Sequence, residues 1–316
     1  MLKKRIYPIC DETFKKWCLS NEKYTNIFLS LGTLETFDVT LRDGLQSVTA
    51  EEQLSITIND KLKMYHNIRF NYNPQNIEIG SLVSEKVLPV FKDTLRLFQI
   101  VNNYLEPSNN YILIPNKKKL EEVIINQQIR HLSLITSVSN SFQLKNTKMT
   151  LDDSDNDINE ILGKLLFIDE NGSITMPKYK LYISCINECP IEGKIDNDFI
   201  VNRLLKLSKM NIDNICLSDT CGTLTLDDFE YIVETCLYFG LEASRLSLHL
   251  HVNPERESIV EKIFFKALDY KILRFDVSNL KTGGCSVTMK KEQLSPNLSY
   301  ELYYKYLCRY IMKNAL

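Results

Sequence analysis

Two histidines, His249 and His251, are the residues of this sequence best suited to bind a metal ion. They lie in the run LSLHLHV at residues 246–252, whose alternation of apolar and other residues is typical of a β-strand. Side chains two residues apart on a strand share a face, so both imidazoles would point the same way. Neutral imidazole is a common ligand of divalent metals. A pair of structural or exposed histidines is the alternative.

A second polar group follows an apolar run near the start of the chain. In the segment FDVTLRDGLQ at residues 37–46, Arg42 and Asp43 come directly after the apolar residues. Asp43 would supply a hard oxygen ligand, and Arg42 would supply a fixed cation beside it. The alternative is a surface salt bridge, which is common and contributes little to stability. A shared site requires that both apolar runs end at the same place in the fold.

Short β-rich runs alternate along the chain with longer helical patterns, which indicates an α/β fold. Strands are expected near 35–41, 76–80, 111–115, 131–136, 180–185, 214–218, 247–251 and 272–277. Helices are expected near 51–69, 85–103, 117–126, 157–166, 197–210, 226–239, 254–268 and 298–312. Eight such pairs predict a single (β/α)₈ TIM barrel. An open, doubly wound sheet is the alternative, but no Gly-rich dinucleotide motif follows a strand.

The expected barrel covers residues 34–316, and residues 1–33 are expected to form a short N-terminal helical extension. Barrel enzymes place their active sites at the carboxyl ends of the strands. If this rule holds here, Asp43 and the histidine pair lie together at the carboxyl end of the barrel, which is its mouth. An acidic run at 152–157 superficially resembles a calcium loop, but it lacks the glycine and the closing glutamate of an EF-hand. We expect carboxylates that cap a helix N-terminus there.

Composition excludes several classes of function. The 316 residues are 44% apolar and 25% charged, with a net charge of -2. The sequence contains no basic stripe, which argues against a nucleic-acid partner. The sequence also contains no apolar run of the length expected for a membrane span or a secretory signal. The nine cysteines lack paired zinc spacing, which favours reduced thiols inside a cell. We therefore expect a cytoplasmic protein.

Several motifs carry a resemblance to a known family. The segment DVTLRDG at 38–44 resembles the first-strand signature of the metal-dependent lyase and Claisen-synthase barrels, which include isopropylmalate synthase, homocitrate synthase and 3-hydroxy-3-methylglutaryl-CoA (HMG-CoA) lyase. The His249–His251 pair resembles the seventh-strand metal motif of that group.

Further matches favour the lyase branch. YISCINECPIEGKI at 182–195 and LSDTCG at 217–222 resemble the fifth- and sixth-strand segments of HMG-CoA lyases. GGC at 283–285 resembles the start of their flexible, cysteine-bearing loop, and NLSYE at 297–301 resembles the stretch that follows it. The similarity spans about residues 34–307.

The resemblance implies a metal site and a reaction. The residues implied to bind the metal are Asp43, His249, His251 and Asn297. The implied cofactor is Mg²⁺ or Mn²⁺, and Zn²⁺ is also compatible with these ligand types. The implied reaction is cleavage of a carbon–carbon bond in an acyl-CoA substrate, and a homodimer is compatible with the family.

Catalytic and substrate-binding roles follow in the same way. The residues implied to be catalytic are Arg42, which would stabilise an enolate, Cys285, which would supply a proton, and Asp219 and His249, which would transfer protons. The residues implied to contact substrate are Gln46, Glu78 and Asn116. Two alternatives remain open: Asp219 would be a helix N-cap, and Glu78 would pair with Arg42 and hold it in place.

The sequence also departs from the family. Val252 stands where the lyases usually have an aspartate, and the loop 286–296 is longer, bulkier and more charged than theirs. These changes would fit a different acyl thioester, a substrate without CoA, or lost activity. A Claisen-type synthase and an inactive barrel that serves as a binding or scaffold protein are therefore the alternatives to a lyase.

Overall fold

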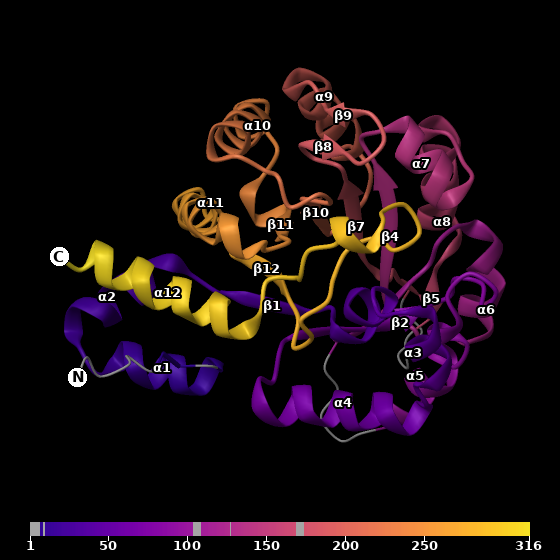
Figure 1. Cartoon of the computed structure of the whole chain (residues 1–316), viewed down its shortest axis with the longest axis horizontal. Coiled ribbons are helices and arrows are strands. Elements are labelled where there is room, and N and C mark those ends of the chain that lie inside the picture. Colours follow the sequence, from indigo (N-terminus) through magenta and orange to yellow (C-terminus); the bar gives the residue numbers. More distant parts are fainter. Residues whose placement is uncertain (1–6, 9, 104–108, 127, 169–173) are drawn as a thin grey trace.

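The computed structural model describes residues 7–8, 10–103, 109–126, 128–168 and 174–316. Its centre is a closed barrel of parallel strands in the order β1-β12-β11-β10-β7-β4-β3-β2 (Figure 1). The barrel strands are β1 Glu35–Asp38, β2 Asn76–Ser81, β3 Asn109–Leu113, β4 His131–Ser137, β7 Lys178–Ser184, β10 Asn214–Ser218, β11 Leu246–His249 and β12 Arg274–Val277. The predicted (β/α)₈ barrel is confirmed. The open sheet is excluded because β1 pairs with both β2 and β12.

Helices follow each barrel strand and cover its outer face. They are α3 Ala50–Ser55 and α4 Ile58–Asn71, α5 Thr94–Val101, α6 Leu120–Ile125, α7 Asn140–Thr147 and α8 Leu151–Lys164, α9 Asn197–Leu207, α10 Leu226–Tyr238, α11 Glu257–Asp269 and α12 Tyr300–Asn314. Two small antiparallel hairpins, β5 Phe167–Ile168 with β6 Ile174–Thr175 and β8 Glu188–Cys189 with β9 Gly193–Lys194, lie outside the barrel sheet. The strands and helices bury one large apolar core, as burial of both strand faces in an α/β barrel requires.

The N-terminal extension is helical, as the sequence predicted. It consists of α1 Asp11–Leu19 and α2 Glu22–Leu31, which lie beside α12 (Figure 1). The Phe14 ring contacts the Tyr304 ring at a centroid distance of 5.8 Å, and the Tyr304 hydroxyl donates to Asp11 Oδ1 at 2.9 Å. The extension is thus attached to the last helix of the barrel.

Several predicted elements have the wrong bounds, and the reason is local capping. The helix expected at 51–69 is two helices, because Thr57 caps a new N-terminus for α4 through the backbone N–H of Asp60. The helix expected at 157–166 begins at Leu151, where Thr150 and Asp153 form a capping box. The acidic run therefore lies in the first turns of α8, and its capping role is confirmed.

Two other differences come from turns that a periodicity argument does not detect. The helix expected at 85–103 starts only at Thr94, after a short 3₁₀ turn at Pro89–Phe91. The first strand, expected to reach Leu41, ends at Asp38 and continues as a single turn of π-helix, Thr40–Gly44. Such turns are frequent at functional sites, and this one carries Arg42 and Asp43.

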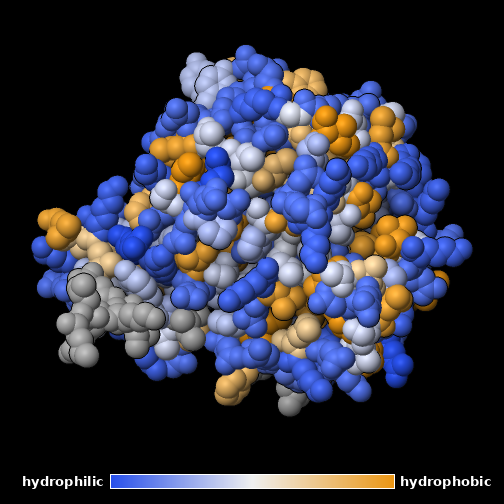
Figure 2. Space-filling model, in the orientation of Figure 1, coloured by the Kyte–Doolittle hydropathy of each residue, from blue (hydrophilic) through white to orange (hydrophobic). Residues whose placement is uncertain are grey.

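Hydrophilic residues predominate on the face shown in Figure 2, and apolar residues appear between them in small groups. Within the described ranges, no helix combines the length and the apolar character that crossing a bilayer requires.

Candidate active site at the barrel mouth

Asp43, His249 and His251 form a buried cluster at the carboxyl end of the barrel. One ligand atom from each lies within 4.8 Å of the others. The two Nε2 atoms are 3.1 Å apart, and Asp43 Oδ2 lies 3.9 Å from that of His249 and 3.7 Å from that of His251. The predicted shared face of the two imidazoles and their meeting with Asp43 are therefore observed.

The turn that carries Asp43 is fixed from below by a buried carboxylate. Asp38 accepts hydrogen bonds from the Thr40 backbone N–H at 2.9 Å, the Thr40 hydroxyl at 3.0 Å and the Tyr300 hydroxyl at 2.8 Å. Burial raises the pKa of Asp38 to about 7, although these donors act in the opposite direction. Hydrogen bonds to Asp38 therefore fix the turn, and the turn places the side chains of Arg42 and Asp43 at the mouth of the barrel.

Asn297 lies beside the cluster, with its amide nitrogen toward Asp43. Its Nδ2 donates to Asp43 Oδ2 at 2.9 Å, and its backbone forms an isolated bridge with His251. Its Oδ1 is buried and has no hydrogen-bond partner among the described residues. A buried amide oxygen without a partner is costly unless something else binds it. One carboxylate, two imidazoles and this free oxygen fit a divalent cation.

Charges in this cluster perturb its titratable groups. Burial lowers the pKa of His249, which favours the neutral imidazole that a metal requires. Burial acts in the same direction on His251, but the neighbouring Asp43 carboxylate raises the pKa of that histidine above its ordinary value. Burial would raise the pKa of Asp43, but the charge of Arg42 overrides it and holds that pKa well below the usual range. Asp43 is therefore an anion at neutral pH.

Arg42 is buried and held in one position. Its Nη1 donates to Asp43 Oδ1 and its Nε donates to Glu78 Oε2, both at 2.6 Å. The Tyr182 hydroxyl donates to the same Glu78 oxygen at 2.9 Å, and the guanidinium carbon lies 4.7 Å from the Tyr182 ring centroid. Glu78 is completely buried beneath this group. The surface salt-bridge alternative for Arg42 and Asp43 is therefore wrong.

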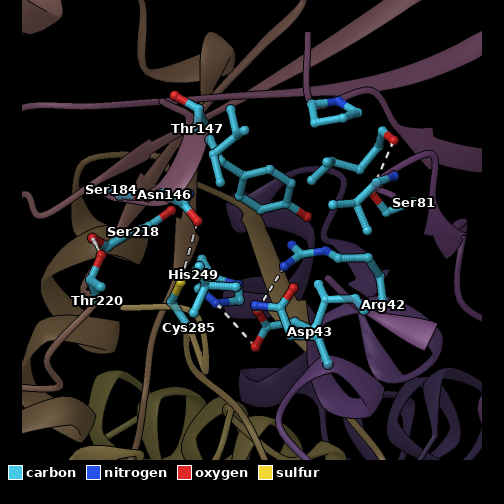
Figure 3. A pocket seen from close by; sticks show the side chains of 18 of the residues that line it. Arg42, Asp43, Ser81, Asn146, Thr147, Ser184, Ser218, Thr220, His249 and Cys285 are labelled. Atoms are coloured by element: carbon cyan, nitrogen blue, oxygen red, sulfur yellow. Dashed lines mark hydrogen bonds and ion pairs between the residues drawn. The ribbon is translucent and has the colours of Figure 1, made fainter. Parts of the chain in front are cut away.

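A cavity opens above this cluster and contains the thiol of Cys285 in its wall. Figure 3 shows Arg42, Asp43, His249 and Cys285 around the same part of the cavity. Gln46 and Tyr182 also line it, and Gln46 Nε2 donates to Gly284 O at 3.3 Å. Apolar side chains also line the cavity, namely Val83, Leu88, Leu113, Pro115, Ile135 and Phe142.

The loop that carries Cys285 is closed over the mouth. The Gly284 N–H donates to Asp43 Oδ2 at 3.1 Å, and the Ser47 hydroxyl donates to Gly284 O at 2.8 Å. Farther along the loop, the Ser286 hydroxyl donates to Gln46 O at 2.7 Å. Burial raises the pKa of Cys285, which keeps the thiol protonated at neutral pH.

Four candidate residues lie outside the cavity wall, and one of them, Asn297, lines a different pocket. Glu78 contacts Arg42, as the alternative interpretation had it. The Asp219 carboxylate accepts backbone hydrogen bonds from Thr223 at 3.0 Å and Leu224 at 3.1 Å, which is a capping arrangement before α10. Asn116 accepts from the Lys118 N–H at 3.1 Å in a separate surface hollow.

The departure at Val252 does not alter the cluster. Its side chain belongs to the apolar core, and its backbone N–H donates to Pro296 O at 2.7 Å. An apolar residue at this place therefore supports the loop and leaves the cluster intact.

Sequence reasoning missed Tyr182, Lys180 and Asp276. The signal was present, because period-two alternation places Lys180, Tyr182 and Ser184 on one face of β7, pointing into the barrel. Asp276 is a carboxylate inside the short apolar strand β12, where an unpaired charge would be costly.

Comparisons with known proteins find similar lyases. No protein-family model matches the chain. The 3-hydroxy-3-isohexenylglutaryl-CoA/hydroxy-methylglutaryl-CoA lyase of Pseudomonas aeruginosa is 24% identical over 247 residues, which are 77% of this chain and 75% of that protein. The mitochondrial hydroxymethylglutaryl-CoA lyase of Mus musculus is 25% identical over 261 residues, 81% of this chain and 74% of that protein. The resemblance predicted from the motifs is confirmed.

Solved structures support the fold. The hydroxymethylglutaryl-CoA lyase of Pseudomonas aeruginosa superposes with a TM-score of 0.70 at 22% identity and covers 84% of this chain and 82% of its own. An HMG-CoA lyase of Acinetobacter baumannii, solved in complex with coenzyme A and 3-methylmalate, gives 0.67 at 24% identity and covers 89% of this chain and 90% of its own. These similarities establish the barrel.

Proposed function

We propose that this chain is a divalent-metal-dependent carbon–carbon lyase that cleaves HMG-CoA, or a related 3-hydroxyacyl thioester, to acetyl-CoA and acetoacetate. The observation that carries the proposal is the buried Asp43–His249–His251 cluster, which shares one cavity with Arg42 and Cys285. The names of the similar lyases support the choice of substrate class.

Asp43, His249, His251 and Asn297 would hold the cation. Mg²⁺ or Mn²⁺ suits the carboxylate and amide oxygens, and the imidazoles are also compatible with Zn²⁺. When bound, such a cation supplies Lewis-acid chemistry that lowers the pKa of a substrate hydroxyl group.

The proton of that hydroxyl passes to a base at the mouth. The two roles predicted for His249 compete, because its Nδ1 faces Asp276 at 3.0 Å and its Nε2 belongs to the ligand cluster. The Asp219 carboxylate is occupied by backbone N–H groups. Of the described residues that line the cavity, Asp43 alone offers a carboxylate. Arg42 holds the pKa of Asp43 well below the usual range, however, so Asp43 is a weak base and keeps only the ligand role. The proton transfer therefore stays with Asp219 or His249, the residues that the sequence predicted for it.

Loss of the hydroxyl proton lets the carbon–carbon bond break, and its electron pair moves to the thioester fragment as an enolate. Arg42 lines the cavity and keeps its charge, since Glu78 and Asp43 offset the cost of its burial and raise its pKa well above the ordinary value. A fixed cation next to the developing negative charge stabilises it without reorganisation.

Cys285 then protonates the enolate carbon. Its raised pKa means that the thiol carries a proton at neutral pH. The proton taken from the hydroxyl group returns to the thiolate, which restores the Cys285 thiol. The reaction thus moves one proton from hydroxyl to carbon and needs no external oxidant or reductant.

A cytoplasmic location and a homodimer remain part of the proposal. The similar lyases include both mitochondrial and cytoplasmic proteins by name. Cell fractionation and light scattering of the purified protein test these two statements directly.

Turnover by matched variants tests the proposed reaction. At saturating Mg²⁺ or Mn²⁺, Asp43→Ala and His249→Ala should abolish acetoacetate release from HMG-CoA. Cys185→Ala should retain it, because Cys185 is buried in the core and does not line the cavity. Full activity of the Asp43 variant would refute the mechanism. Condensation of acetyl-CoA with a 2-oxo acid would favour the synthase alternative, and a protein with neither activity nor bound metal would favour the scaffold.

A further inference from the structure

A buried lysine–aspartate pair lies inside the barrel beneath the ligand cluster. Lys180 on β7 donates from Nζ to Asp276 Oδ1 on β12, and each side chain is 1% exposed. The same ammonium lies 3.4 Å from the ring centroid of Phe37 and 4.7 Å from that of Tyr182. Neither charged residue lines the cavity. The proposed reaction gives this pair no role.

The second oxygen of Asp276 faces the ligand cluster. Asp276 Oδ2 lies 3.0 Å from His249 Nδ1, and the Cys216 thiol donates to the same oxygen at 3.7 Å. The carboxylate thus binds the lysine with one oxygen and the imidazole with the other. Lys180, Asp276 and His249 form one continuous chain of polar contacts from the barrel interior to the mouth.

This chain determines which nitrogen of His249 is available. A carboxylate only accepts hydrogen bonds, so Nδ1 must carry the proton when it binds Asp276. In a neutral imidazole, Nε2 then keeps its lone pair. That atom lies 3.1 Å from His251 Nε2 and belongs to the cluster with Asp43. Residues that orient a metal-binding histidine in this way typically change metal affinity when they are replaced.

We propose that Lys180 is a positioning residue for the metal site, which acts through Asp276 to hold His249 Nε2 toward the ligand cluster. A buried carboxylate that loses its cationic partner is strongly disfavoured, so Asp276 would move away from its present position. That movement removes the acceptor that fixes His249 Nδ1. The inference concerns metal binding, so it stands even if the substrate is not HMG-CoA.

Metal affinity of a matched pair of variants tests the proposal. Lys180→Met removes the ammonium and keeps an unbranched side chain. Lys61→Met is the control, because Lys61 on α4 is also buried and binds the Asp93 carboxylate and Val90 O outside the barrel. Binding of Mn²⁺ to the purified proteins is measured from the loss of the free-ion signal in electron paramagnetic resonance, and Tm is recorded for each.

We expect Lys180→Met to weaken Mn²⁺ binding about 10- to 100-fold. Lys61→Met should lower Tm to a similar extent and leave the Mn²⁺ affinity unchanged. Wild-type affinity in Lys180→Met would overturn the proposal. An equal loss of affinity in Lys61→Met would also overturn it, since general destabilisation would then explain both results.

A second measurement keeps the proposal testable if Lys180→Met does not fold. The chain contains only four histidines, so ¹⁵N-histidine labelling gives a simple NMR spectrum of their ring tautomers. In metal-free wild-type protein, His249 should show the form protonated at Nδ1, and Asp276→Ala should show a mixture. If His249 keeps the same tautomer in Asp276→Ala, the contact with Asp276 does not determine which ring nitrogen carries the proton, and the proposal is refuted. If the wild-type protein binds Mn²⁺ but does not cleave HMG-CoA, that result counts against the proposed reaction and leaves the role of Lys180 unaffected.

Discussion

Replacement of Glu78 by glutamine should reduce turnover without removing any group that touches substrate. Glu78 Oε2 accepts from Arg42 Nε at 2.6 Å and from the Tyr182 hydroxyl at 2.9 Å in a completely buried position. Removing one partner of a buried ion pair costs about 3–5 kcal/mol. Glutamine keeps an acceptor oxygen, and a hydrogen bond to a charged group contributes about 1.5–3 kcal/mol. We therefore expect Glu78→Gln to lower the free energy of unfolding by about 3 kcal/mol, the lower end of the range for breaking a buried ion pair.

The larger effect should be on kcat. Arg42 would keep Asp43 as its charged partner, so the guanidinium should shift toward it and away from the enolate position. A displacement of about 1 Å at a reacting centre costs about 100-fold in rate. Steady-state kinetics with HMG-CoA at saturating metal should show kcat reduced by about this factor, with a much smaller change in KM.

Asp155→Asn is the matched control for this variant. Asp155 on α8 accepts two hydrogen bonds at 2.6 Å from Arg203, and this buried pair lies away from the cavity. The control should lose stability by a comparable amount and keep wild-type kcat. Wild-type kcat in Glu78→Gln, or an equal loss in Asp155→Asn, would refute the claim that Glu78 acts by holding Arg42.

Two further variants separate the loop chemistry from the loop structure. Cys285→Ser should reduce kcat by about 10²- to 10⁴-fold because a hydroxyl is a far weaker acid than a thiol, while Mn²⁺ affinity stays unchanged; wild-type kcat would exclude Cys285 as the acid. Gly283→Ala should lower Mn²⁺ affinity, because a Cβ there would lie 2.8 Å from the side chain and backbone of Asn297. Gly163→Ala in α8 meets no atom within 4 Å and should instead raise the unfolding free energy by up to about 1 kcal/mol in denaturant titrations; equal metal affinity in both glycine variants would contradict this account.

The barrel could be predicted from sequence because its strands are short apolar runs separated by helical periodicity. The strand at Asn214–Ser218 has the predicted bounds, and the other strands shift by a few residues at their ends. Helix starts were less predictable. Thr57 and Thr150 each cap a helix through local hydrogen bonds that compete with periodicity.

The ligand cluster was predictable for a related reason. Asp43 follows one strand and His249 ends another, and parallel strands of a barrel end at one mouth. Asn116 also follows a strand, yet its side chain turns back to cap the next residues and stays outside the cavity. The end of a strand therefore predicts a place at the mouth and leaves the direction of the side chain open.

The inward direction of Lys180 could be predicted from the alternation along its strand, but its contact with Asp276 could not, because that contact depends on closure of the barrel. Lys180 and Asp276 are far apart in sequence and lie on strands that are not neighbours in the sheet. Each looks like an isolated charge inside an apolar run. Their contact appears only when the inward faces of β7 and β12 meet across the barrel.

The most direct test of the central claim is the product balance of the wild-type protein. HMG-CoA is incubated with the purified protein and Mg²⁺ or Mn²⁺, and acetyl-CoA and acetoacetate are measured together over time. The account predicts equal amounts of the two products, no products in the presence of a chelator, and recovery when metal is restored. Release of neither product by a protein that binds Mn²⁺ at one equivalent would contradict the assigned substrate, and release that persists with the chelator would contradict the metal-dependent mechanism.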